Sequence, residues 1–186
     1  MQKIILYGDS ILAGYRNGHA TELVTESLQT YFSDHQVINS SIPGATTEEG
    51  LDFLSLKVTN LKYSAVVLGL GTNDCSVKLG LSPGHYAANL DKLVQMIGRD
   101  KIVLMGPAYT NWKIAEDHSW SRTLQFQLVA QECAKHNNLP FLDLAKAMEN
   151  SNHPNDLLED DGIHLNDEGI ALLTKKLAPL IKEVLA

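Results

Sequence analysis

The sequence predicts a three-layer α/β/α domain built around a flavodoxin-like, doubly wound sheet of about five parallel strands. Short apolar runs alternate with longer amphipathic stretches along the chain, a pattern typical of strand–helix repeats in parallel sheets. Two of these runs, 65–70 (AVVLGL) and 102–105 (IVLM), are continuously apolar, as expected for strands covered on both faces. A length of 186 residues suits one domain, so we assign residues 1–186 to a single domain.

Each expected strand is a run of apolar, β-branched or aromatic residues that is too short to form a helix. The first run ends at Gly8, the second is a weaker run after His35, and the last follows Pro140. Strands are expected at 3–7, 37–39, 65–70, 102–105 and 141–142.

The stretches between the strands carry apolar residues at helical spacing. Thr46 and Thr47, followed by two glutamates, predict an N-cap and an acidic first turn. In the last stretch an apolar stripe predicts an amphipathic helix, which Pro179 should kink. Helices are expected at 22–32, 46–61, 82–98, 119–138 and 167–185.

The composition narrows the class of protein. Apolar residues make up 44% and charged residues 20% of the chain, which is typical of a soluble globular protein. The formal charge of −7 disfavours a nucleic-acid partner.

Cys75 and Cys133 are too few for a disulfide framework and lack metal-ligand spacing, so we expect free thiols and a cytoplasmic location. No apolar run approaches the ~20 residues that span a bilayer, and we expect no integral membrane segment.

Four short motifs stand at the expected carboxyl ends of strands or before the last helix. Ligands of doubly wound sheets bind outside the carboxyl ends of the strands. The first motif is Gly8-Asp-Ser-Ile, and the second is the loop 39–47, which contains Pro43-Gly44. The third is Gly71-Thr-Asn-Asp, and the fourth is Asp161-Gly-Ile-His.

Together, in this order, the four motifs resemble those of the Ser-Gly-Asn-His hydrolases, also called the GDSL esterase and lipase family. The resemblance extends from Gly8 to His164, which is nearly the whole chain. It implies one SGNH-hydrolase-like domain that hydrolyses a small-molecule acyl ester without a metal or cofactor. The family acts on simple esters, thioesters, lysophospholipids and acetylated sugars, so the substrate itself stays open, as does the oligomeric state.

The resemblance implies that Ser10 is the nucleophile, His164 the base and Asp161 its orienting carboxylate. The residue types suit this chemistry, because a serine hydroxyl becomes a good nucleophile only when an adjacent base takes its proton. A carboxylate on the other ring nitrogen fixes the histidine tautomer. We choose Asp161 over Asp160 because the family's Asp-x-x-His pattern selects it.

The resemblance also assigns the oxyanion hole to the backbone N–H groups of Ser10 and Gly44 and to the side-chain amide of Asn73. Donors aimed at the developing negative oxygen stabilise the tetrahedral intermediate. A glycine lets the backbone approach the substrate closely, and an asparagine amide is a neutral donor.

Each assignment has a structural alternative when its residue is taken alone. Ser10 could cap a helix, Gly44 could be a turn glycine after Pro43, and Asn73 could form an Asx turn. His164 could be an ordinary surface or structural histidine. We interpret Asp9 and Asp74 as residues that organise loops by bonding to backbone amides, and Cys75 as a small buried thiol.

The segment 107–120 is the one long stretch without a clear element, and it follows a strand, so it should lie at the same rim as Ser10. Its aromatic residues Tyr109, Trp112 and Trp120 could line an acyl or leaving-group pocket, or simply anchor a surface loop.

Two alternative functions remain open. A flavodoxin-like binding module would hold a phosphate at a helix N-terminus, but the chain has neither a Gly-x-Gly-x-x-Gly nor a P-loop motif. An acyltransferase would use the same triad, with an alcohol in place of water.

Overall fold

The fold is known from a computed structural model, which describes residues 2–186. Five parallel strands form one sheet with the order β2-β1-β3-β4-β5, so the predicted α/β class and doubly wound parallel sheet are confirmed. The strands are β1 (Gln2–Gly8), β2 (His35–Asn39), β3 (Ala65–Gly69), β4 (Ile102–Met105) and β5 (Phe141–Leu142).

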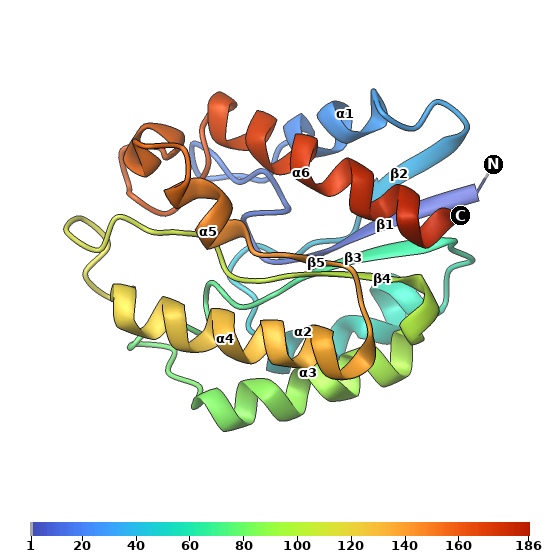
Figure 1. The fold of residues 1–186 in the computed structure, drawn as a ribbon, viewed down its shortest axis with the longest axis horizontal. Helices are drawn as coiled ribbons and strands as arrows, with labels where there is room; N and C mark the ends of the chain where they lie inside the picture. The colour runs from blue at the N-terminus through green and yellow to red at the C-terminus, as the bar shows by residue number, and fades with distance from the viewer. Residues whose placement is uncertain (1) are drawn as a thin grey trace.

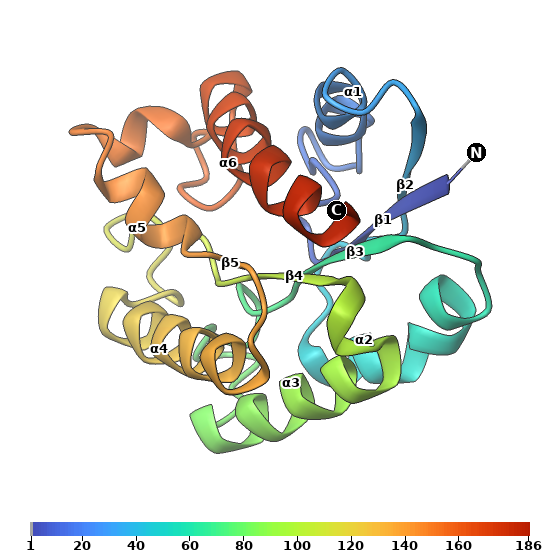
Figure 2. The ribbon, with the colours of Figure 1, turned by 45° about the vertical axis from the view of Figure 1, so that its right-hand side comes forward.

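Helices cover both faces of the sheet. On one face lie α1 (Leu23–Gln29) and α6 (Asp167–Leu185), and on the other lie α2 (Thr47–Leu54), α3 (Pro83–Ile97) and α4 (Trp120–Asn137) (Figure 1). The short helix α5 (Leu144–Glu149) follows β5 directly (Figure 2). A π-helical turn (Ser55–Thr59) extends α2, and 3-10 turns occupy Arg99–Lys101 and Pro154–Leu157.

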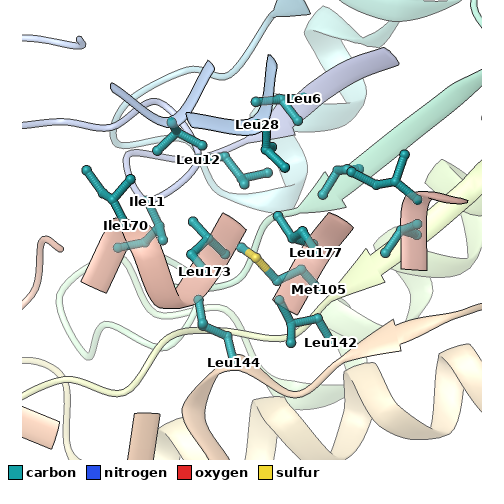
Figure 3. Close-up of a cluster of buried hydrophobic side chains, with 14 of the residues drawn as sticks. Leu6, Ile11, Leu12, Leu28, Met105, Leu142, Leu144, Ile170, Leu173 and Leu177 are labelled. Carbon is teal, nitrogen blue, oxygen red and sulfur yellow. The ribbon is translucent and has the colours of Figure 1, made fainter. Parts of the chain in front are cut away.

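The sheet separates two hydrophobic cores because successive side chains of a strand point to opposite faces. In β1, Ile4 and Leu6 face α1 and α6, whereas Ile5 and Tyr7 face the opposite layer. Figure 3 shows the first core, where leucines of α6 pack against side chains that come from β1, β4 and β5. Both layers are therefore apolar on the sheet side, which explains the continuous apolar runs of the inner strands.

The helix ends differ from the predictions where local hydrogen bonds compete with the helix. The first helix stops at Gln29 rather than at residue 32, because Tyr31 and Phe32 donate to the carbonyls three residues earlier and the Gln29 amide binds the carbonyls of Phe32 and His35. The α-helical part of the second ends at Leu54. Pro179 lies inside α6 without ending it, and α5 was not predicted.

The carboxyl ends of the strands lie together at one edge of the sheet. The segments that follow β1, β3 and β4 gather there, on the side opposite to the C-terminus (Figure 1). Strands β1 and β3 end level with each other, since Gly8 pairs with Gly69. In the part of the chain from Gln2 to Ala186, no helix has both the length and the apolar composition to cross a membrane.

Candidate active site

Ser10 lies in a tight turn directly after β1. Its side chain is nearly buried, and no helix begins there, since the next helix starts at Leu23 after Glu22. The helix-cap alternative for Ser10 is therefore wrong. A Cβ at Gly8 would collide with the Gly69 carbonyl, so the glycine before Asp9 lets β1 and β3 approach closely.

The structure brings Ser10 and His164 together across 154 residues of sequence. His164 Nε2 lies 3.0 Å from Ser10 Oγ, and His164 Nδ1 lies 2.6 Å from an Asp161 carboxylate oxygen. This arrangement suits a Nδ1–H that donates to Asp161 and a serine hydroxyl that donates to Nε2. The three groups form a continuous chain of hydrogen bonds, the geometry that proton transfer from serine to histidine needs.

Local backbone contacts hold Asp161 in place. Its other carboxylate oxygen accepts the N–H groups of Ile163 and His164 at 2.9 and 3.0 Å. Partial burial acts to raise the pKa of Asp161, but the hydrogen bonds from the His164 ring and from these two N–H groups outweigh it. The net pKa lies below the ordinary value, so the carboxylate stays ionised beside the ring.

Gly44 and Asn73 lie in the two loops beside the nucleophile turn. Gly44 has a φ of +83°, a left-handed conformation that favours glycine. The Asn73 amide donates one N–H to the Ala45 carbonyl at 3.0 Å, so it reaches across to the other loop rather than forming an Asx turn. Among residues 2–186 the amide makes no other hydrogen bond through this group, so a second N–H is available as a donor.

Asp9 connects the nucleophile turn to the loop after β3. One carboxylate oxygen accepts the Ile11 N–H at 3.0 Å, and the other accepts the Thr72 N–H at 3.1 Å. Burial raises the pKa of Asp9 to about 6, although both hydrogen bonds act to lower it. The predicted loop-organising role of Asp9 is confirmed by these contacts.

Asp74 plays the same part between the loop after β3 and the start of α2. Its carboxylate accepts both the backbone N–H and the hydroxyl of Thr47, and the Asn89 amide donates to that same hydroxyl. Burial is the main cause that raises the pKa of Asp74. Thr46 caps α2 in a capping box with Glu49, as its sequence position predicted.

Two residues that the sequence analysis did not single out lie beside His164. The Tyr15 ring packs against the His164 ring, with 4.8 Å between the ring centres. Arg16 joins the nucleophile segment to the histidine segment through ion pairs with Glu159 at 2.7 Å and Asp167 at 2.8 Å. Their position shortly after Ser10 is the only sequence signal that could have found them.

The segment 107–120 lies at the same rim, as predicted. Its Asn111 N–H donates to the Gly162 carbonyl at 2.7 Å, two residues before His164. Tyr109 and Trp120 pack against each other with 5.3 Å between ring centres, whereas Trp112 is exposed. This pairing fits the loop-anchoring alternative for these two aromatic side chains.

His118, in the same segment, is buried without a hydrogen-bond partner on either ring nitrogen among residues 2–186. Burial lowers its pKa below the ordinary value, because a charged imidazolium would lose its hydration there.

Cys75 and Cys133 are both free and buried, and burial raises the pKa of Cys75 well above the usual value. The prediction of a small buried thiol at Cys75 is confirmed. In the chain that the structure describes, from residue 2 onward, no cluster of three or more His, Cys, Asp or Glu side chains could hold a metal ion.

Comparison with known proteins identifies relatives along nearly the whole chain. Residues 6–172 match the model of the family described as the GDSL-like Lipase/Acylhydrolase family. An arylesterase of Vibrio mimicus is 32% identical over 99 residues, which are 52% of this chain and 48% of that relative. The protein named thioesterase 1/protease 1/lysophospholipase L1 of Escherichia coli strain K12 is 25% identical over 182 residues, covering 96% of this chain and 84% of that protein.

Solved structures share the fold. The crystal structure of a lipase/acylhydrolase from Enterococcus faecalis superimposes with a TM-score of 0.95 at 32% sequence identity, over 98% of this chain and 96% of that one. An acetylxylan esterase from Geobacillus stearothermophilus superimposes with a TM-score of 0.78 at 22% identity, over 97% and 94% of the two chains, and shows the same fold.

Proposed function

The chain belongs to the GDSL-like lipase/acylhydrolase family and is a carboxylic ester hydrolase, and we propose that it cleaves esters through an acyl-enzyme formed on Ser10. The observation that carries this proposal is the chain of hydrogen bonds from Ser10 Oγ through His164 to Asp161. A binding module would need no activated serine hydroxyl, so this contact favours an enzyme. We further propose that residues 1–186 form one domain.

In the first half-reaction, Ser10 Oγ attacks the ester carbonyl carbon while its proton moves to His164 Nε2. The carbonyl oxygen becomes an oxyanion, which accepts hydrogen bonds from the Ser10 and Gly44 N–H groups and from the Asn73 amide. The bond to the alcohol oxygen then breaks, and the histidine returns the proton to that oxygen. This step releases the alcohol and leaves the acyl group on Ser10.

In the second half-reaction, water attacks the acyl carbon while His164 takes the water proton. The bond between this carbon and Ser10 Oγ then breaks, His164 returns the proton to Oγ, and the carboxylic acid is released. Asp161 keeps its negative charge throughout and stabilises the imidazolium that forms twice in the cycle. An acceptor alcohol in place of water would make the same site an acyltransferase.

The relatives guide the choice of substrates. Their names cover aryl esters, thioesters and lysophospholipids, and we propose that this chain shares activity on short aryl esters and thioesters. We also propose a reducing, cytoplasmic location, in line with the free thiols of Cys75 and Cys133.

The Ser10→Ala variant tests the proposed reaction. It should abolish hydrolysis of short p-nitrophenyl esters and labelling by a fluorophosphonate, while the melting temperature stays close to that of the wild type. Ser40→Ala is a matched control, because Ser40 is also a buried serine at the end of a strand and should keep full activity. Wild-type rates in Ser10→Ala would refute the nucleophile assignment.

A further inference from the structure

A pocket of about 290 Å³ lies against His164 and Asp161. Two chain segments form its walls, namely residues 15–18, which follow the nucleophile turn, and residues 159–161, which precede His164. We call it the Tyr15 pocket. The comparisons and the proposed reaction assign no role to it.

The pocket lies next to the base and away from the two loops of the oxyanion hole. His164 lines it, whereas Gly44 and Asn73 do not. In the reaction proposed above, on which this inference rests, His164 must protonate the oxygen of the departing alcohol. That oxygen therefore lies within hydrogen-bond reach of Nε2, which brings the alcohol part of the substrate close to the histidine. The Tyr15 pocket adjoins this histidine, although Ser10 itself does not line it.

Fixed ion pairs hold the two walls together. Arg16 binds Glu159 at 2.7 Å and Asp167 at 2.8 Å, and it also donates to the Leu165 carbonyl. The two carboxylates thus offset the charge of the guanidinium and weaken its attraction for an anion. Asp160 adds a further carboxylate to the wall, so the pocket repels a phosphate or another acidic group.

Three polar groups of the wall have no hydrogen-bond partner among residues 2–186, and two of them, on Asn17 and Asp160, are exposed to water. In residues 2–186, no hydrogen bond involves the Tyr15 hydroxyl, the Asn17 side-chain amide or the Asp160 carboxylate. Tyr15 is half-buried with its ring against His164, so its position is set by packing. A carboxylate accepts hydrogen bonds from hydroxyl groups, an amide both donates and accepts, and a tyrosine offers an apolar face with a polar end.

We propose that the Tyr15 pocket binds the alcohol part of the substrate and selects esters of uncharged polyhydroxy alcohols, such as glycerol or a sugar, over esters of simple or anionic alcohols. The aromatic face packs against the carbon skeleton of the polyol. Asp160 and Asn17 bind its free hydroxyl groups, and the net negative wall disfavours a phosphorylated alcohol.

The test compares butyrate esters that differ only in the alcohol, namely glycerol monobutyrate, ethyl butyrate, butyrylcholine and the monobutyrate of glycerol 3-phosphate. The measured quantity is the ratio of kcat/KM for glycerol monobutyrate to that for ethyl butyrate. Because the acyl group is the same, effects on Ser10 or on the oxyanion hole cancel in this ratio. We expect a ratio of about ten or more, which corresponds to one or two net hydrogen bonds, and the lowest kcat/KM for the phosphate ester.

Two variants remove the pocket's polar groups. Asn17→Gly deletes the amide without strain, because Asn17 already has a φ of 53°, and Asp160→Asn deletes the charge. Each should lower the ratio at least threefold, and the double variant should bring it close to one. Asn152→Gly and Asp156→Asn are matched controls, since Asn152 has a φ of 68° and both residues are exposed outside the pocket. These controls should leave the ratio unchanged.

The outcomes separate this inference from the proposed function. If Ser10-dependent hydrolysis is absent for every ester, the proposed function itself fails. If all four esters are cleaved at similar kcat/KM, or the phosphate or choline ester is preferred, the function stands and the polyol assignment is wrong. A ratio that is high in the wild type but unchanged in both pocket variants would also overturn it.

Discussion

The carboxylate of Asp74 accepts hydrogen bonds from both the backbone N–H and the hydroxyl of Thr47, at 3.1 and 2.6 Å. This contact joins the loop after β3, which carries Asn73, to the start of α2, just after Gly44. Asp9 makes the equivalent connection from the nucleophile turn to Thr72. Two buried carboxylates therefore hold together the three segments that we propose as the oxyanion hole.

Thr47→Val should lower both stability and kcat. It removes the hydroxyl that binds Asp74 and also leaves the Asn89 amide without its acceptor, at a cost of about 1–3 kcal/mol in unfolding free energy. We expect kcat to fall about tenfold or more, because small displacements of catalytic groups are costly. Thr174→Val is the control, since it loses a buried hydroxyl in α6 far from the site. An equal kcat in both variants would contradict the role of the Asp74 contact.

Asn73→Ala should lower kcat by about 10²–10³ with little change in KM, as for the loss of one oxyanion donor. Asn73→Asp should be worse, because it places a negative charge where the oxyanion forms. Steady-state kinetics on a p-nitrophenyl ester check both variants. An effect confined to KM would mean that Asn73 binds substrate and is not an oxyanion donor.

Gly44→Ala tests the backbone donor. A Cβ there meets no atom within 4 Å, but φ is +83°, so the substitution strains the backbone by about 1–2 kcal/mol and turns the Gly44 N–H away. We expect a loss of kcat of about tenfold or more. Gly98→Ala also places a Cβ in free space at a positive φ, here +101°, and should lose stability while keeping its activity. If the two variants have the same kcat, Gly44 is an ordinary turn glycine.

Asp9→Asn should change the pH dependence of stability. In the wild type, burial holds the pKa of Asp9 at about 6 in the folded protein, against 3.8 for the free side chain. Between pH 3.8 and about pH 6 the folded state therefore binds more protons than the unfolded state. The unfolding free energy of the wild type falls as the pH rises through this range. Urea unfolding at pH 4, 5, 6 and 7 should show Asp9→Asn gaining about 3 kcal/mol relative to the wild type, at about 1.4 kcal/mol per pH unit. A difference that does not vary with pH would show that Asp9 ionises normally.

His118→Leu should stabilise the protein in mild acid. Burial lowers the pKa of His118 in the folded state, so the unfolded chain binds the extra proton as the pH falls below about 6.5, and wild-type stability is lost there. The leucine variant lacks this loss. Near pH 8 it should be about as stable as the wild type, because neither ring nitrogen of His118 has a hydrogen-bond partner among residues 2–186. Melting temperatures at pH 5 and pH 8 measure the effect. A parallel decline of both proteins between these pH values would contradict it.

Much of the fold could be predicted from the sequence because buried strands produce short, continuous apolar runs. The strands at 65–70 and 102–105 were predicted to within one residue. The end of α1 and the short α5 could not be predicted, because side-chain hydrogen bonds such as those of Gln29 decide where the chain leaves the helix.

The sequence by itself determined the α/β class, the family and the motifs that carry Ser10, Asp161 and His164, because these features depend on residue type and local spacing. Only the tertiary structure decided which distant groups touch. The 3.0 Å contact between Ser10 and His164, the carboxylate links of Asp9 and Asp74, and the Tyr15 pocket all join segments far apart in the chain. Such contacts depend on strand order and register, since β1 and β3 end level at Gly8 and Gly69, and no local pattern records that alignment.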